Sequence, residues 1–200
     1  MTSGTVGVLA LQGDVPEHAE VAASIVGPDH VRPVRTPKDL AAVDAVLLPG
    51  GESTTLSRLL DHAALREPLL ERGHQGLPIM ATCAGLILLA RELEPSPHGR
   101  DPKTLGLLDV KVRRNDYGRQ VDSFETRLEV EGLGKDVPAA FIRAPRILSV
   151  GPDVRVLARV REDPVLVREG HLWGLTFHPE VTGDPRLHRY FLTESGILTP

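Results

Sequence analysis

The sequence predicts an α/β fold in which a mostly parallel β-sheet carries helices on both faces and is followed by an antiparallel extension. In residues 1–92, short apolar segments alternate with segments whose apolar residues recur at helical spacing. The apolar segments show no polar alternation, which is typical of strands buried on both faces. After residue 104, short β-like segments follow one another until residue 184. Alternating strands and helices favour a parallel sheet, and consecutive strands favour antiparallel pairing.

Four strands are expected in the first half of the chain. They are Val6 to Leu11, Val31 to Val34, Asp44 to Leu48 and Pro78 to Thr82. The first strand is followed by a helix from Asp14 to about Ile25, in which Asp14 and Glu17 resemble a capping box. A second helical region begins with Ser53 as its cap, and a third helix is expected over Ala84 to Glu92.

The second half is expected to be mainly antiparallel β-structure. Glu94 to Thr104 is rich in proline and polar residues and is predicted to be a loop. The β-like segments after it are Leu108 to Val112, Phe124 to Val130, Ala140 to Ile142, Val154 to Val160, Val165 to Val167 and Leu172 to Phe177. A closing helix is predicted over Asp184 to Leu192. Since no repeat or clear linker divides the chain, a single domain over residues 1–200 is expected.

Composition limits the classes of function. The chain has 200 residues, 25% of them charged, and a formal net charge of −4, which gives no electrostatic case for binding nucleic acid or a membrane. The longest apolar run, which follows Cys83 from Leu86 to Ala90, is far shorter than the roughly 20 residues that a membrane span needs. One cysteine cannot form an intramolecular disulfide, which fits a reducing compartment. No targeting segment is visible, and a cytoplasmic location is expected.

That cysteine, Cys83, lies in a turn between a predicted strand and a predicted helix. The turn is flanked by the small residues Ala84 and Gly85, which allow a tight nucleophile elbow. Unpaired N–H groups at a helix N-terminus favour a thiolate, and the N–H of Ala84 is placed to bind a developing oxyanion. The alternative is a structural thiol buried between strand and helix.

A histidine and a glutamate late in the chain supply a base and its partner. In an extended segment, residues i and i+2 face the same side, so His178 and Glu180 can meet. Pro179 keeps His178 out of the helical region. The second ring nitrogen is then free to accept the proton of Cys83. Taken alone, the pattern also fits a surface histidine beside a loop carboxylate.

A glycine turn over Leu48 to Ser53 exposes backbone N–H groups, which suits an oxyanion hole or the binding of a small polar substrate. The alternative is an ordinary tight turn before a helix. Since sites in parallel sheets lie at the carboxyl ends of strands, Gly13, Gly50-Gly51 and Cys83 should gather along one edge. No metal or cofactor is expected. Seven other histidines have no metal-ligand spacing and are expected to be solvated or locally bonded: His18, His30, His62, His74, His98, His171 and His188.

Together these residues resemble the class I, or triad, glutamine amidotransferases, in which a Pro-Gly-Gly turn, a cysteine elbow and a late His-Pro-Glu occur in this order. Within the class, the chain is similar to the glutaminase subunits of pyridoxal 5'-phosphate synthases. Four stretches carry this similarity: Leu9 to Gly13, Pro49 to Thr55, Arg114 to Glu125 and Phe141 to Pro145. The family's elbow often has glycine where this chain has Ala81. The resemblance implies a three-layer, flavodoxin-like fold.

The resemblance also implies roles for individual residues. Cys83 would attack the glutamine carboxamide, His178 would move the proton, and Glu180 would orient His178. The N–H groups of Gly51 and Ala84 would bind the oxyanion. The residues implied to bind L-glutamine are Gly51, Glu52, Ser53, Arg114, Ile142 and Arg143.

The implied function is hydrolysis of L-glutamine to L-glutamate and ammonia, which a synthase subunit in a hetero-oligomer would use to make pyridoxal 5'-phosphate. One alternative is a glutaminase for another pathway, such as histidine biosynthesis, or a γ-glutamyl peptidase. The Arg114 to Glu125 stretch argues against it. A second alternative is a non-catalytic docking module, which the intact set of Cys83, His178 and Glu180 argues against.

Overall fold

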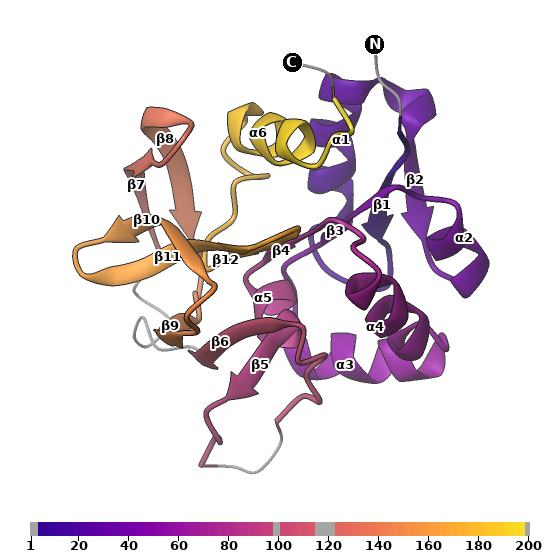
Figure 1. The fold of residues 1–200 in the computed structure, drawn as a ribbon, viewed down its shortest axis with the longest axis horizontal. Coiled ribbons are helices and arrows are strands. Elements are labelled where there is room, and N and C mark those ends of the chain that lie inside the picture. Colours follow the sequence, from indigo (N-terminus) through magenta and orange to yellow (C-terminus); the bar gives the residue numbers. More distant parts are fainter. Residues whose placement is uncertain (1–3, 98–100, 115–122, 199–200) are drawn as a thin grey trace.

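The computed structural model describes residues 4–97, 101–114 and 123–198 (Figure 1). Within these residues, seven strands form a central sheet in the order β10-β11-β12-β4-β3-β1-β2. The strands are β1 (Val6–Leu9), β2 (Val31–Val34), β3 (Ala45–Leu48), β4 (Ile79–Thr82), β10 (Arg155–Val160), β11 (Asp163–Glu169) and β12 (Leu172–Leu175). Pairing is parallel from β12 through to β2, and β11 and β10 extend the sheet antiparallel at one edge.

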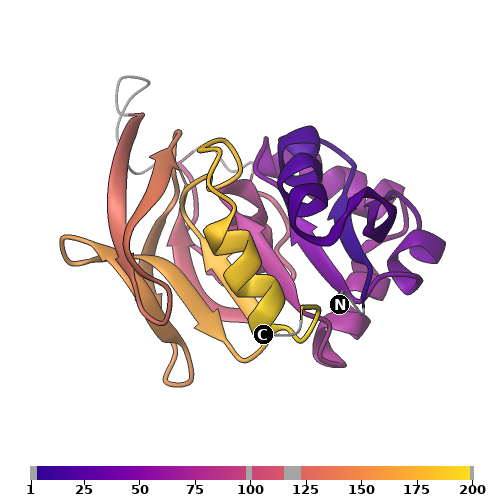
Figure 2. The same cartoon turned by 90° about the horizontal axis from the view of Figure 1, so that it is seen from above.

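Helices cover both faces of this sheet, as the sequence predicts. They are α1 (Val15–Val26), α2 (Pro37–Ala41), α3 (Ser53–His62), α4 (Arg66–His74), α5 (Ala84–Leu89) and α6 (Arg186–Glu194), with a short 3₁₀ turn η1 (Pro28–His30) after α1. Figure 2 shows α1 and α6 over the same face. The other helices pack on the opposite face.

Alternation along the buried strands divides the interior into two cores. In β3, Val46 and Leu48 pack with the core of α3, α4 and α5, whereas Ala45 and Leu47 pack with the core of α1 and α6. All four side chains are buried. An uninterrupted apolar strand is therefore explained by a sheet that is covered on both sides.

The extension consists of a small three-stranded sheet, β5-β6-β9, and a hairpin, β7-β8. These strands are β5 (Ala90–Leu93), β6 (Leu108–Arg113), β7 (Phe124–Val130), β8 (Gly134–Phe141) and β9 (Arg146–Val150). The pairings β6-β9, β7-β8, β10-β11 and β11-β12 are antiparallel, which confirms the expected mode, while β5 pairs with β6 in parallel.

One local prediction is wrong, and two elements were not predicted at all. The helix expected over Ala84 to Glu92 ends at Leu89, because residues from Ala90 pair with β6 instead. Strand β9 was not predicted, and it forms by pairing with β6. The short helix α2 was also missed, although Thr36 and Asp39 form a capping box at its start.

The carboxyl ends of β12, β4, β3 and β1 lie side by side in the sheet. The turns that follow them carry His178, Cys83, Gly50-Gly51 and Gly13. This arrangement confirms that the predicted turns share one edge of the sheet, and it adds the histidine to them.

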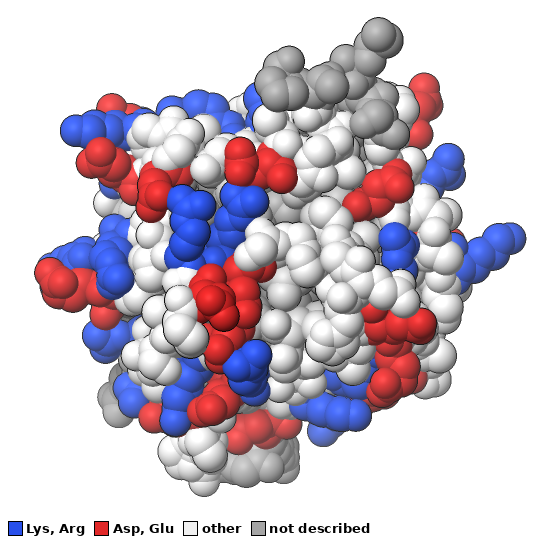
Figure 3. Space-filling view, in the orientation of Figure 1, with Lys and Arg blue, Asp and Glu red and all other residues white. Residues whose placement is uncertain are grey.

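None of the helices in the described ranges is long and apolar enough to cross a membrane. On the face drawn in Figure 3, basic and acidic side chains lie interspersed.

Candidate active site

Cys83 occupies a strained turn between β4 and α5. Its backbone has φ 48° and ψ −103°, a region that side chains with a Cβ rarely adopt. The turn is fixed by the N–H of Cys83, which donates to the Leu175 carbonyl of β12 at 2.8 Å. It also lies close to β3, since a Cβ on Gly85 would be 2.4 Å from the Leu48 carbonyl oxygen. The predicted elbow is therefore present, and it is held by the strand on each side of β4.

His178 follows β12 and is held by β8 on its other side. Its backbone N–H donates to the Ala140 carbonyl at 2.8 Å. Nδ1 of the ring lies 2.7 Å from Oε1 of Glu180, with both side chains buried. The predicted contact between positions i and i+2 across Pro179 is formed. Since Nδ1 faces a carboxylate, Nε2 is the ring atom left for Cys83, and the two side chains line the same cavity.

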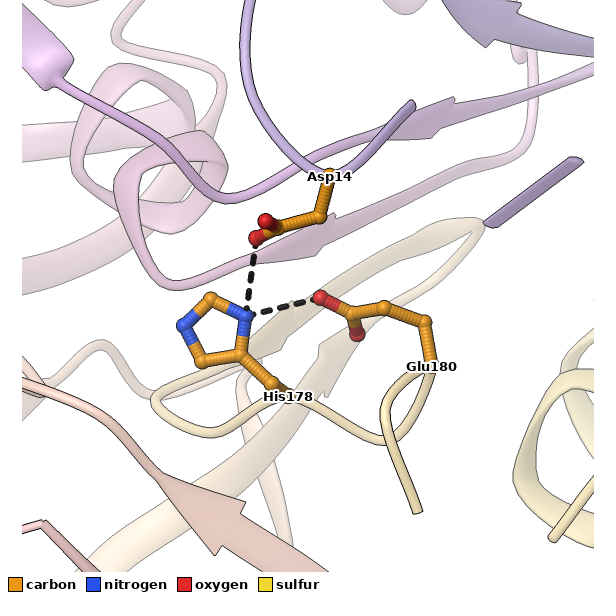
Figure 4. A group of neighbouring side chains, drawn as sticks. All are labelled: Asp14, His178 and Glu180. Carbon is orange, nitrogen blue, oxygen red and sulfur yellow. Dashed lines mark hydrogen bonds and ion pairs between the residues drawn. The ribbon is translucent and has the colours of Figure 1, made fainter. Parts of the chain in front are cut away.

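A second carboxylate, that of Asp14, meets the same ring nitrogen. Figure 4 shows Asp14 and Glu180 approaching Nδ1 of His178 from different segments, with Asp14 Oδ2 at 3.2 Å. The predicted capping box at Asp14 is wrong, because its side chain makes no cap hydrogen bond to α1. The sequence signal for its role was only its place after β1.

These contacts favour a protonated imidazole. Burial by itself lowers the pKa of His178, but hydrogen bonds with Asp14, Cys83 and Glu180 outweigh burial and raise that pKa to about 12. The hydrogen bond to His178 lowers the pKa of Asp14. Burial raises the pKa of Glu180, against the opposing effect of His178. The imidazole is thus a strong base for the thiol proton.

One possible metal-ligand atom from each of Asp14, His178 and Glu180 lies within 4.8 Å of the other two, a spacing that is also found around bound metal ions. Two ligands about 2.1 Å from one ion at a tetrahedral angle are roughly 3.4 Å apart. The Nδ1–Oε1 distance of 2.7 Å is shorter and matches a direct hydrogen bond. The arrangement is therefore better explained by one N–H on Nδ1 of His178 that both carboxylates share than by a bound metal ion.

A cavity of about 350 Å³ opens beside Cys83 and His178. All the residues predicted to bind glutamine line it: Gly51, Glu52, Ser53, Arg114, Ile142 and Arg143. Ala84, predicted for the oxyanion hole, also lines it, and so do Asp14 and Ile87, which the sequence did not single out. Glu180 lies behind His178. The thiol of Cys83 approaches the Ile142 carbonyl oxygen at 3.9 Å.

The glycine turn after β3 has no space for side chains. A Cβ on Gly50 would lie 2.3 Å from Cε1 of His178. Gly51 has φ 150°, and a Cβ there would lie 2.6 Å from Oε1 of Gln12. That amide oxygen accepts the N–H of Glu52 at 2.9 Å, so Gln12 fixes the turn. Gly50 is needed for the turn to approach His178, and Gly51 is needed for it to pack on Gln12.

Glu52 and Arg114 form the polar wall of the cavity. Glu52, rather than the predicted Ser53, caps α3 and accepts the N–H groups of Thr54 and Thr55 at 3.1 and 2.6 Å. Burial raises the pKa of Glu52, but these hydrogen bonds lower it to about 2. Arg114 Nη2 lies 3.4 Å from Glu52 Oε1. The Asn115 to Asp122 part of the resembling stretch lies outside the described residues.

The expectation that the other histidines are solvated or locally bonded is wrong for three of them. The ring of His171 is partly buried, and its Nε2 lies 2.8 Å from the carbonyl oxygen of Gly73, 98 positions away in sequence. His18 and His188 are fully buried, and their rings contact each other although 170 positions separate them in sequence. Spacing in the sequence gave no signal for this pair. His62 and His74 are exposed, and His98 lies outside the described residues.

The chain matches the SNO glutamine amidotransferase family over residues 8–196. It is 52% identical over 188 residues to the pyridoxal 5'-phosphate synthase subunit PdxT of Thermotoga sp. (strain RQ2), covering 94% of this chain and 97% of that protein. It is 51% identical over 193 residues to the PdxT subunit of Mycolicibacterium vanbaalenii, covering 96% and 98%. A solved structure described as "Crystal structure of glutamine amidotransferase" has 46% identity and a TM-score of 0.88, covering 96% of this chain and all of that one.

The fold agrees with that of the solved glutamine amidotransferase structure. Because the family match and both relatives extend over almost the whole length, the chain belongs to the SNO glutamine amidotransferase family.

Proposed function

We propose that the chain is the glutaminase subunit of a pyridoxal 5'-phosphate synthase. In this role it hydrolyses L-glutamine to L-glutamate and ammonia and passes the ammonia to the synthase subunit. The observation that carries the proposal is that Cys83 and His178 line one cavity and that Glu180 is bonded to His178, although Cys83 follows β4 and the other two follow β12. The names of the relatives support the pathway.

The first half of the reaction forms a thioester. The thiolate of Cys83 attacks the carboxamide carbon, and the carbonyl oxygen becomes an oxyanion that the N–H groups of Gly51 and Ala84 bind. When the tetrahedral intermediate collapses, the C–N bond breaks. Nε2–H of His178 protonates the leaving nitrogen, so that ammonia departs and a γ-glutamyl thioester remains.

The second half restores the enzyme. Nε2 of His178, now neutral, takes a proton from water as the water oxygen attacks the thioester carbon. The C–S bond then breaks, which releases glutamate and the Cys83 thiolate. Throughout, Glu180 and Asp14 hold the Nδ1–H side of the ring, which keeps Nε2 directed toward the sulfur.

Glu52 and Arg114 suit the two charges at the α-carbon of glutamine. The low pKa of Glu52 keeps its carboxylate charged and able to attract an α-ammonium group. The planar guanidinium of Arg114 can bind an α-carboxylate through two hydrogen bonds. The two side chains form an ion pair with 3.4 Å between Nη2 of Arg114 and Oε1 of Glu52, and the charged groups of glutamine would take the place of this pairing.

We assign the chain to a cytoplasmic hetero-oligomer with the synthase subunit. A glutaminase that released ammonia continuously would consume glutamine without a product, so activity is expected to rise when the subunit docks. The expected partner surface is near the cavity, where Ile142 is exposed to 42% despite its apolar side chain.

The test is ammonia release from glutamine by wild type and Cys83→Ala, each with and without the synthase subunit. Wild type with its partner should release ammonia, and Cys83→Ala should release none while still binding the partner. Glutamine labelled with ¹⁵N at the amide should yield labelled pyridoxal 5'-phosphate only in the wild-type complex. Retained release by Cys83→Ala, or equal wild-type rates with and without the partner, would contradict the proposal.

A further inference from the structure

We propose that His18, supported by His188, is a positioning residue that holds the Glu180 carboxylate in place behind the catalytic histidine. The catalytic triad would then extend inward to two further side chains. This inference rests on the proposed function only for its turnover assay. It depends on a buried cluster that the mechanism above does not use.

The cluster joins three separate segments of the chain. His18 comes from α1, His188 from α6, and Glu180 from the segment between β12 and α6. Both histidines are fully buried, and Nδ1 of His18 lies 3.0 Å from Nε2 of His188. Nε2 of His18 lies 3.1 Å from Oγ1 of Thr82 and 3.5 Å from Oε2 of Glu180.

Oε2 of Glu180 needs a hydrogen-bond donor. Its Oε1 is bound to His178, but its buried Oε2 has no hydrogen-bond partner among the described residues. A buried carboxylate oxygen without a donor costs free energy, and the only ring nitrogen facing it among those residues is Nε2 of His18. The 3.5 Å separation is longer than a regular hydrogen bond because the same Nε2 faces Oγ1 of Thr82 at 3.1 Å, so that its single N–H is shared between the two oxygens.

The hydrogen bonds around His18 also determine its tautomer. The Thr82 hydroxyl donates to the Leu48 carbonyl at 3.4 Å, so its oxygen can accept from Nε2–H of His18. Nδ1 of His18 then accepts from Nε2–H of His188, and Nδ1 of His188 carries only a lone pair. That atom is the one nitrogen of the pair without a partner in the described part of the chain, as this assignment requires.

The opposite assignment is unfavourable at both ends. It would point a lone pair of His18 at the Glu180 carboxylate and leave a buried N–H on Nδ1 of His188 without an acceptor. Burial lowers the pKa of both histidines, to about 4 for His188, so each ring is neutral near pH 7. His18 therefore acts on Glu180 as a neutral hydrogen-bond donor and adds no charge to the triad.

Two conservative substitutions separate positioning from packing. The amide nitrogen of His18→Gln can occupy the place of Nε2 and still donate toward Glu180. The shorter His18→Asn reaches only the place of Nδ1, on the side of His188. In the complex with the synthase subunit, we expect kcat of His18→Asn to fall about 10-fold to 100-fold, the worth of a hydrogen bond to a charged group. His18→Gln should stay within about 3-fold of wild type, with KM for glutamine little changed in both.

A second measurement does not require turnover. Because the chain has a single cysteine, alkylation by iodoacetamide reports only on Cys83. His18→Asn should slow this alkylation in the wild-type background and have little further effect in Glu180→Gln, where no carboxylate remains to be held.

Each outcome decides the question. Equal loss in His18→Asn and His18→Gln, or no loss in either, would overturn the proposal. An equal effect of His18→Asn on alkylation with and without Glu180 would also overturn it, because His18 would then act through packing. If wild type failed to release ammonia but alkylation followed the expected pattern, the proposed function would fail while the positioning role would stand.

Discussion

Because the backbone at Cys83 is strained, we predict that Cys83→Gly has a higher free energy of unfolding than Cys83→Ala. Cys83→Ala keeps a Cβ at φ 48° and ψ −103°, whereas Cys83→Gly does not. Both variants lose the same sulfur contacts. The difference in their stability therefore isolates the conformational strain of the elbow.

The size of the effect follows from two opposing contributions. A non-glycine residue in a sparsely populated region costs on the order of 1–3 kcal/mol. Glycine loses more chain entropy on folding than alanine, by roughly 0.5–1 kcal/mol. Cys83→Gly should thus be more stable than Cys83→Ala by about 1 kcal/mol. In a domain of this size, that difference raises Tm by about 2–4 °C.

Thermal and urea unfolding of the two variants measure this difference. Ala81→Gly is the matched control, since Ala81 is buried within β4 and has no positive φ. We expect that control to lower the free energy of unfolding. If Cys83→Ala proved as stable as Cys83→Gly, the elbow would hold no strain and the reasoning would be refuted.

Three further changes test the cavity. Gly50→Ala should lower kcat about 100-fold, because its Cβ would displace His178 by about 1 Å; a crystal structure of the variant and its kcat would check this. Glu52→Gln should make the free energy of unfolding less dependent on pH in acid. The pKa of Glu52 is lowered from 4.5 to about 2 in the folded protein, so its charged carboxylate stabilises the fold above pH 4.5, and this stabilisation is lost as the pH falls toward 2. Urea unfolding of wild type and Glu52→Gln at several pH values between 2 and 4.5 measures this; parallel plots of the free energy of unfolding against pH would contradict the prediction. Arg114→Lys should raise KM for glutamine about 10-fold with kcat nearly unchanged, since the lysine cannot form the paired hydrogen bonds; an unchanged KM would exclude Arg114 from substrate binding.

The sequence was informative wherever a local pattern has one structural solution. Apolar segments without alternation gave strands β1, β3 and β4, because only a sheet covered on both faces buries such residues. Small residues around Cys83 gave the elbow. The contact between His178 and Glu180 followed from the two-residue period of an extended chain.

Other features depend on partners far away in sequence. Ala90 to Leu93 continues a leucine-rich run, yet it becomes a strand because the edge of β6 offers backbone hydrogen bonds. The side chain of Asp14 does not cap α1 and contacts His178 instead, a residue in the last part of the chain. The pairing of His18 with His188 has no local signal at all. Tertiary contacts decided these cases, and single-sequence patterns do not contain them.

The position of β12 links completion of the fold to the onset of chemistry. This strand is last in the described sequence, but it lies between β4 and β11 near the middle of the sheet. During synthesis Cys83, which directly follows β4, emerges ninety-five residues before His178, and the place that β12 takes beside β4 cannot be filled until those later residues are made. A partly made chain would carry a thiol without a proton acceptor. The order of strands thus delays the approach of the Cys83 thiol to the His178 imidazole until the sheet is closed.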